Sequence, residues 1–169
     1  MKVTLNARAF RSAMMATEKK GHRPQLEGVS VEASGRIAAT NGHVLYACTQ
    51  SNAGNFGEDK IVILAGKIAA SEETLEFDTH TGICTSNRGK VFTFQFLDGV
   101  FPQIDRVIPT LPRAETAVSV RVDSALLAII GSIMNGNIDI YLGGATGAIL
   151  FKSVIGDGEE IAALMPIRK

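Results

Sequence analysis

The order of secondary-structure signals repeats three times along this chain of 169 residues. Each unit reads as a strand, a helix and then three strands, and the units cover about residues 2–50, 60–97 and 118–165. Repeats of this kind stack on one another, because one unit cannot bury its own apolar face. The repeat therefore predicts an α+β architecture of stacked units.

The first unit carries the clearest start and turn signals. A strand is expected over Val3–Leu5, and Asn6 is a good N-cap for a helix that the pattern extends to Lys19. The pair Asn41-Gly42 is the strongest hairpin signal in the chain. The strands expected after the helix are Leu26–Glu32, Arg36–Thr40 and Val44–Thr49.

The second and third units follow the same order. The second is expected to contain a short helix over Ala65–Ala70, and in the third Asp123 caps a helix. A proline-containing stretch from Asp98 to Thr116 links the two units. The strands expected in them are Lys60–Leu64, Thr74–Asp78, Gly82–Thr85, Val91–Phe96, Val118–Val122, Ile138–Leu142, Ala148–Val154 and Glu160–Met165.

Composition indicates a globular protein, with 46% hydrophobic residues to build a core. No apolar run approaches the roughly 18 residues that span a bilayer, and the first residues lack the apolar run of a signal peptide, so we expect a cytoplasmic protein. Cys48 and Cys84 lie in apolar strands without a nearby partner cysteine. Their spacing favours reduced core thiols over a disulfide or a zinc site.

Positive charge is concentrated at the start of the chain, although the formal net charge is zero. Residues 1–23 hold six cations and one anion, whereas the remaining chain holds eleven cations and sixteen anions. Spacings of three, four and four residues put Arg8, Arg11, Met15 and Lys19 on one face of the first helix. This face can contact phosphates; the alternative is an ordinary solvated helix face.

Two segments place prolines among large apolar residues, and both follow a strand. They are Phe101–Pro109 and Met165–Lys169. Proline ends ladder pairing, so these side chains are displayed instead of being buried in a sheet. We interpret the two segments as walls of one apolar groove for a partner's peptide; the alternative for Met165 and Ile167 is the end of a core strand.

Three sequence motifs resemble those of the bacterial beta sliding clamp, in the order of that family. Residues 23–29 (RPQLEGV) with 37–45 (IAATNGHVL) resemble the signature of its central domain. Residues 97–109 (LDGVFPQIDRVIP) resemble the segment that closes that domain, and 163–168 (ALMPIR) resemble the clamp's C-terminus. The chain departs from the family at three positions: Asn41 stands for Asp, Val44 for Arg and Ile167 for Met.

The resemblance implies a DNA-clamp fold of the α+β class, with three β-α-β-β-β repeats. Helices would line the interior of a ring and antiparallel sheets its outside. Residues 1–109 would form one complete clamp domain of two repeats, and 110–169 half a domain. This corresponds to a shortened form of about half the usual length, with phage or plasmid origin left open.

The resemblance implies the function of a DNA polymerase processivity factor. Such a protein encircles duplex DNA without sequence preference, and it tethers a polymerase and a clamp loader through short peptides. The implied DNA-binding residues are Arg8, Arg11, Lys19, Lys20 and Arg23. The implied peptide groove consists of Thr40, Gly42, His43, Leu45, Pro102, Val107, Ala163, Met165, Pro166 and Ile167. For His43, stabilisation of its own turn is an equal alternative.

The repeat count, the charges and the histidines bear on three functional interpretations of the chain. A ring of twelve units would need four chains of three units, which predicts a homotetramer. The zero net charge and a third helix without cations favour the alternative, a clamp-like interaction module that binds polymerase peptides without encircling DNA. An enzyme is not expected, because His22, His43 and His80 are scattered and no nucleophile accompanies a base. No cofactor or metal is implied.

Overall fold

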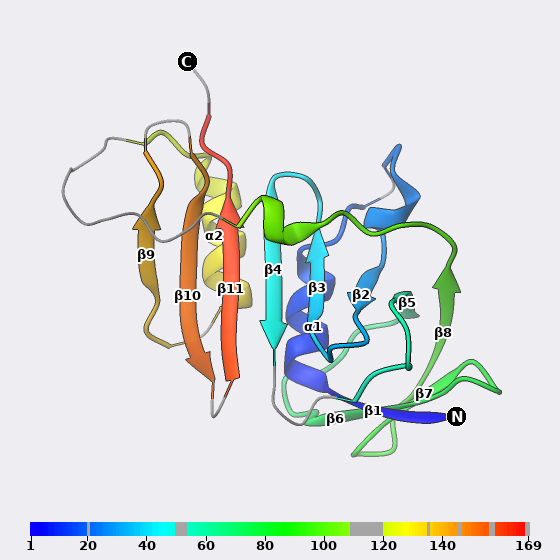
Figure 1. Ribbon diagram of the computed structural model, residues 1–169. Helices are drawn as coiled ribbons and strands as arrows, with labels where there is room; N and C mark the ends of the chain where they lie inside the picture. The colour runs from blue at the N-terminus through cyan, green and yellow to red at the C-terminus, as the bar shows by residue number, and fades with distance from the viewer. Residues whose placement is uncertain are drawn as a thin grey trace.

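The computed structural model describes residues 1–19, 21–49, 54–108, 120–134, 136–144, 147–155 and 158–167. These residues form two α-helices and an 11-stranded antiparallel sheet (Figure 1). The helices are α1 (Ala7–Met15) and α2 (Ser124–Ile133). The strands are β1 (Lys2–Asn6), β2 (Val29–Val31), β3 (Ile37–Thr40), β4 (Val44–Thr49), β5 (Lys60–Ala65), β6 (Thr74–Asp78), β7 (Ile83–Ser86), β8 (Val91–Leu97), β9 (Asp139–Leu142), β10 (Ile149–Ile155) and β11 (Gly158–Leu164).

The strand order in the sheet is β1-β6-β7-β8-β5-β2-β3-β4-β11-β10-β9. The first two units exchange their first strands, since β1 pairs with β6 and β5 pairs with β2. The third unit joins the first through antiparallel pairing of β4 with β11, over the register Val44↔Leu164 to Thr49↔Glu159. Segments from opposite ends of the chain are thus neighbours in one sheet.

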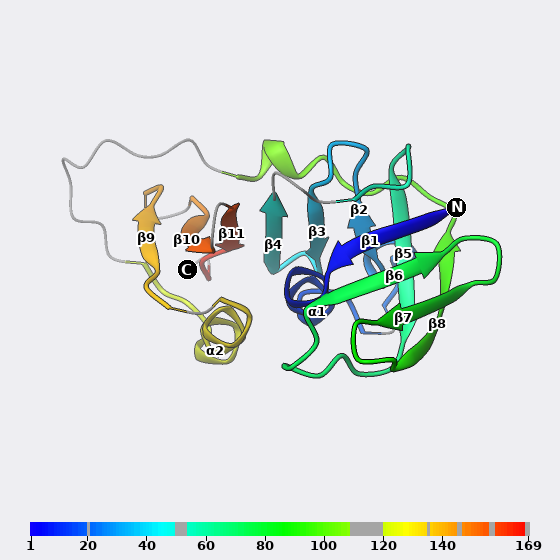
Figure 2. The same cartoon turned by 90° about the horizontal axis from the view of Figure 1, so that it is seen from below.

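The main core lies between the sheet and the two helices, which pack on the same side of β3, β4 and β11 (Figure 2). Phe10 of α1 is buried against Phe77 of β6, with ring centroids 5.3 Å apart, and Phe77 packs on Phe94 of β8 at 5.0 Å. The helices also meet directly, because the Ser12 hydroxyl donates to the carbonyl of Ile133 at 3.0 Å. The core therefore extends from the first unit into the third.

Both predicted helix N-caps are confirmed. The Asn6 side chain accepts a hydrogen bond from the Ala9 amide at 2.9 Å, and the Asp123 side chain accepts one from Ala125 at 2.8 Å. Each cap satisfies an amide that has no partner within its own helix.

The expectation of three full β-α-β-β-β repeats is wrong in three places. Residues 65–70 form no helix; Gly66 adopts a φ of +122°, which is incompatible with helical backbone. The first helix ends at Met15, four residues before Lys19, because the chain turns away and the Glu18 amide donates to Leu26. Residues 120–122 are not a strand, and the rest of the expected strand at 118–122 lies outside the described residues.

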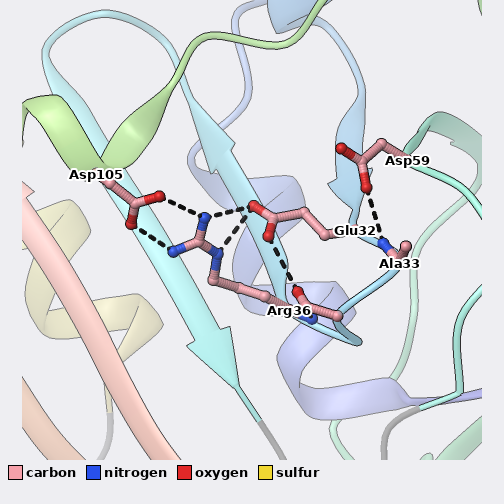
Figure 3. A network of polar contacts seen from close by, with 6 residues as sticks. Glu32, Ala33, Arg36, Asp59 and Asp105 are labelled. Atoms are coloured by element: carbon pink, nitrogen blue, oxygen red, sulfur yellow. Dashed lines mark hydrogen bonds and ion pairs between the residues drawn. The ribbon is translucent and has the colours of Figure 1, made fainter.

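A second apolar cluster covers the face of the sheet opposite the helices. We call residues 98–108 the strap; Ile104 in its short 3₁₀ turn, Ile104–Arg106, is buried against Leu45 and Ala163. Arg36 holds the strap by donating to both oxygens of Asp105, at 2.6 and 3.0 Å (Figure 3). The Arg36 guanidinium lowers the pKa of the Asp105 carboxyl, so this pairing fixes the strap across β3 and β4 at neutral pH.

Candidate peptide-binding groove

An apolar cavity of about 210 Å³ lies where the β3–β4 turn, the strap and the end of β11 meet. Its lining comes from five parts of the chain that are separated in sequence. The lining residues are Arg23, Leu26, Thr40, Gly42, His43, Val44, Leu45, Pro102, Gln103, Ile104, Val107, Ala148, Ala163 and Met165. We call this cavity the groove.

The β3–β4 turn forms one wall of the groove and is held by side-chain hydrogen bonds. The Asn41 side-chain oxygen accepts from the amides of His43 and Val44, both at 2.9 Å. The Thr40 hydroxyl donates to the Val44 carbonyl at 2.7 Å and accepts from the Gly42 amide at 3.1 Å. Asn41, where the clamp family has Asp, thus still closes the turn through its carbonyl oxygen.

Gly42 and Arg23 form a close contact at the mouth of the groove. Gly42 adopts a φ of +86°, and a Cβ at this position would lie 2.8 Å from Arg23 Nη1. Arg23 also donates to the Asn41 carbonyl at 3.0 Å and to Glu18 at 3.3 Å. The arginine therefore lies against the turn, and the positive φ at residue 42 favours glycine there.

The floor of the groove is buried and its rim is apolar but exposed. Leu45 of β4 and Ala163 of β11 are cross-strand partners that lie on the floor with Ile104 of the strap. Val107 and Met165 are large apolar side chains that line the groove and are exposed. The Met165 amide donates to the His43 carbonyl at 3.3 Å, which ties the chain after β11 to the turn.

Eight of the ten residues that the sequence assigned to a groove line this cavity. The other two, Pro166 and Ile167, follow directly but are not among the lining residues; the Ile167 amide donates to the Arg121 carbonyl at 2.8 Å. The groove residues that the sequence missed are Leu26, Val44, Gln103, Ile104 and Ala148, and it placed Arg23 in the DNA set. Leu26 and Ile104 are large apolar residues, which favours burial, but their type does not say which cavity they line.

The five predicted DNA-binding cations do not form one free stripe. Arg8 donates to Glu160 at 3.4 Å, and Arg11 donates to the Ala69 carbonyl at 2.9 Å. Lys19 is exposed but lies beyond the end of α1, and Arg23 contacts the groove turn. Lys20 lies outside the described residues. Contact of these residues with DNA stays a prediction.

Arg8 belongs to a buried polar cluster that the sequence analysis did not find. Glu160 of β11 is completely buried, and its carboxylate accepts from the Tyr46 hydroxyl at 2.8 Å and from Arg8. Burial raises the pKa of the Glu160 carboxyl and, with the nearby carboxylate, raises the pKa of the Cys48 thiol to about 11. One feature of the sequence could have indicated this burial. Glu160 lies on the same side of its strand as the apolar residues Ala162 and Leu164, which are buried.

Neither a metal site nor a membrane-spanning helix is found in the described part of the chain. His, Cys, Asp and Glu residues form no group there that could hold a metal ion. Neither described helix is long and apolar enough to cross a membrane.

Comparison with known proteins gives structural matches alone: no protein-family model and no curated protein matches the sequence. The DNA polymerase sliding clamp of Pseudomonas aeruginosa is 14% identical with a TM-score of 0.71, and the match covers 100% of this chain and 67% of that one. The Bacillus subtilis clamp is 14% identical with a TM-score of 0.70, and the match covers 100% of this chain and 64% of that one. The Bartonella birtlesii sliding clamp bound to griselimycin is 15% identical with a TM-score of 0.72, and the match covers 99% of this chain and 66% of that one. Over its whole length, therefore, this chain has the fold of the bacterial beta sliding clamps.

Proposed function

We propose that this protein is a DNA sliding clamp, a processivity factor that tethers replication proteins to duplex DNA by binding their short peptides in the groove. The observation that carries the proposal is the groove itself. Its floor and rim are apolar, and it is assembled from the turn, the strap and the end of β11 in a chain with the clamp fold. A polymerase and a clamp loader are the partners we propose for it.

The shape of the groove suits one or two apolar side chains of an extended peptide. At about 210 Å³ it is smaller than most cavities for drug-sized ligands. Exposed Val107 and Met165 would be covered on binding, so the apolar area removed from water would supply most of the affinity. Arg23 at the mouth is a cation that an acidic residue of the peptide can approach.

Interaction with DNA would rest on the helix side of the sheet. Both helices lie on that side (Figure 2), so in a ring they would face the duplex together. Lys and Arg contacts to phosphate need no base readout, which suits a protein that slides. We propose residues 1–109 as a complete domain, 110–169 as half a domain, four chains per ring and a location at the bacterial nucleoid.

Peptide binding tests the groove directly. A fluorescent apolar peptide from a polymerase clamp-binding segment is titrated with the protein and with the variants Val107→Ser and Met165→Ser. Loss of rim contacts should weaken binding at least about tenfold in each variant. Val100→Ser is the matched control, since Val100 is an exposed strap valine that does not line the groove. Unchanged affinity in both rim variants would show that the peptide binds elsewhere.

A second candidate function is a clamp-like module that binds the same peptides without encircling DNA. It is favoured by α2, whose residues Ser124–Ile133 include no cation. Loading onto nicked circular DNA, followed by linearisation, separates the two functions. A clamp is retained on the circle and released from the linear form, whereas the module binds both forms equally or neither.

A further inference from the structure

The side chain of Asn41, in the turn between β3 and β4, is held in one orientation. Its Oδ1 atom accepts hydrogen bonds from the backbone amides of His43 and Val44, both at 2.9 Å. Asn41 is partly exposed, and Gly42 and His43 are exposed, so solvent can reach the turn. The side-chain carbonyl of Asn41 is therefore both polarised by two donors and accessible.

The residue that follows Asn41 carries the nearest nucleophile. Gly42 has no side chain, so nothing at its Cα hinders the approach of its nitrogen to Asn41 Cγ. A bond between these two atoms closes a five-membered ring through Cβ, Cα and the backbone carbonyl carbon of Asn41. The Gly42 amide donates to the Thr40 hydroxyl at 3.1 Å. Ring closure is slow, because this hydrogen bond breaks when the nitrogen loses its proton.

Ring closure places negative charge on Oδ1 of Asn41, because the carbonyl oxygen becomes an oxyanion when the nitrogen attacks Cγ. The amides of His43 and Val44 already donate to this atom. Preorganised amide donors at a developing oxyanion lower the barrier of acyl transfer. They also fix Oδ1 in place, which leaves the side-chain nitrogen, Nδ2, as the group that departs.

We propose that Asn41 is a self-modification site, at which the folded turn converts the asparagine to aspartate through a cyclic imide. The Gly42 nitrogen loses its proton to a base in solution and bonds to Asn41 Cγ. The bond from Cγ to Nδ2 breaks, and Nδ2 takes up a proton and leaves as ammonia. Water then adds at Cγ, the ring bond breaks, and the Gly42 nitrogen regains a proton. One water is consumed and one ammonia is released, without an oxidant or a reductant.

The same two amide donors select the product. Water attack at Cγ of the imide gives aspartate, whereas attack at the backbone carbonyl gives isoaspartate, which adds a methylene to the main chain. The donors polarise the Cγ carbonyl, and the pairing of Thr40 with Leu45 opposes an extra main-chain atom in the turn. The folded protein should therefore yield mainly aspartate, whereas unstructured peptides yield mainly isoaspartate.

Conversion adds a negative charge beside Arg23 at the mouth of the groove. Arg23 donates to the backbone carbonyl of Asn41 at 3.0 Å, and it is the cation that an acidic residue of a peptide can approach. A carboxylate at residue 41 competes with the peptide for this cation, so conversion weakens the binding of acidic peptides. This consequence rests on the proposed function, but the conversion itself does not.

Peptide mapping by mass spectrometry measures the conversion in the full chain during incubation at neutral pH. The segment that contains Asn41 should gain the mass difference between O and NH. Mapping also separates this site from Asn135-Gly136, the second Asn-Gly pair of the sequence. Chromatography of the same segments distinguishes aspartate from isoaspartate.

Asn87 is the matched internal control. Its Oδ1 accepts from the backbone amides of Glu73 and Thr74, at 3.0 and 3.4 Å, but the next residue is Arg88 and not glycine. Asn41 should convert at least about tenfold faster than Asn87, because a side chain at the following residue hinders the nitrogen. Equal rates at the two asparagines would overturn the proposal.

Unfolding in guanidinium chloride removes the amide donors and leaves the sequence unchanged. Conversion of Asn41 should then be slower by about threefold or more, and isoaspartate should become the main product. Conversion in the folded protein that is no faster than in denaturant would show that the fold protects Asn41, and it would overturn the proposal. Isoaspartate as the main product of the folded protein would do the same.

Asn41→Asp supplies the product without incubation. The fluorescent peptide with an added glutamate should bind this variant about threefold or more weakly, whereas its glutamine counterpart should bind it as it binds the unaltered protein. Asn87→Asp is the control, since it adds the same charge at a residue that does not line the groove. Equal losses for both peptides would refute the competition for Arg23. Failure of every peptide to bind would count against the proposed function, and the mass measurement would still decide the conversion.

Discussion

Replacing Arg8 by Met should destabilise the protein in a strongly pH-dependent way. Met keeps the apolar stem of the side chain but removes the cation that donates to Glu160 at 3.4 Å. The completely buried carboxylate would then retain Tyr46 as its hydrogen-bond donor among the contacts described. A buried charge that loses its partner is costly, and the carboxylate avoids this cost by taking up a proton.

Protonation of Glu160 sets an upper limit on the stability that the Arg8→Met variant loses. The ordinary pKa of a glutamate is 4.5. Protonating it costs about 1.4 kcal/mol per pH unit above this value, which gives about 3.4 kcal/mol at pH 7 and about 2 kcal/mol at pH 6. Burial already raises the pKa of Glu160 in the unaltered protein, so part of this cost is present before the substitution. We therefore expect a loss of about 2 kcal/mol at pH 7.

The sign of the pH dependence follows from linkage. A folded-state pKa above the unfolded value contributes stability at low pH, and this contribution is lost as pH rises through the folded pKa. Arg8→Met raises the folded pKa of Glu160 further, so the variant should lose most stability above pH 7 and approach the unaltered protein near pH 5.

Urea denaturation followed by circular dichroism between pH 5 and 8 measures this difference. Glu160→Gln provides the second arm of a double-mutant cycle, because a neutral residue at 160 has no charge to stabilise. In that background Arg8→Met should cost less than about 1 kcal/mol. An equal cost in both backgrounds, or a cost that does not change with pH, would refute the assignment of the effect to the buried carboxylate.

Three other predictions concern the groove and the thiols. Gly42→Ala should cost about 1 kcal/mol or more and weaken peptide binding, because of the φ of +86° and the contact with Arg23; equal affinity by fluorescence polarisation would contradict this. Ile104→Ala should cost about 2–4 kcal/mol in denaturant unfolding and detach the strap; an unchanged midpoint would count against the second cluster. Cys48 and Cys84 should resist a thiol reagent at pH 8 until the protein unfolds, since burial raises their pKa values to about 11 and about 12; fast labelling of the folded protein would be inconsistent with that burial.

Local signals were sufficient for much of the fold. The bounds of β4 and β6 match the expectation residue for residue, because apolar alternation and flanking turn residues agree there. Asn6 and Asp123 are caps for the same local reason. The helix predicted over residues 65–70 does not form, although the composition of the segment favours one. The positive φ of Gly66 is not helical, and Ile68 is buried in the main core without a helix.

The site depended on information that periodicity does not contain. Pairing of β4 with β11 joins residues more than a hundred positions apart, and no local pattern specifies it. The motif resemblance, in contrast, identified eight lining residues because it compares whole segments with those of a known fold. The buried carboxylate at Glu160 was missed, because its partners Arg8 and Tyr46 come from the first unit and are defined only once β11 lies beside β4.

The pairing of β4 with β11 couples ligand binding in the groove to the association of the first and third units. Leu45 and Ala163 face each other across the β4–β11 junction, so detachment of the third unit would remove one side of the binding site. A ligand that binds only the closed junction stabilises it by RT ln(1 + [L]/Kd), which is about 2.7 kcal/mol at a hundredfold excess over Kd. Every partner that occupies the groove therefore also holds the first and third units together.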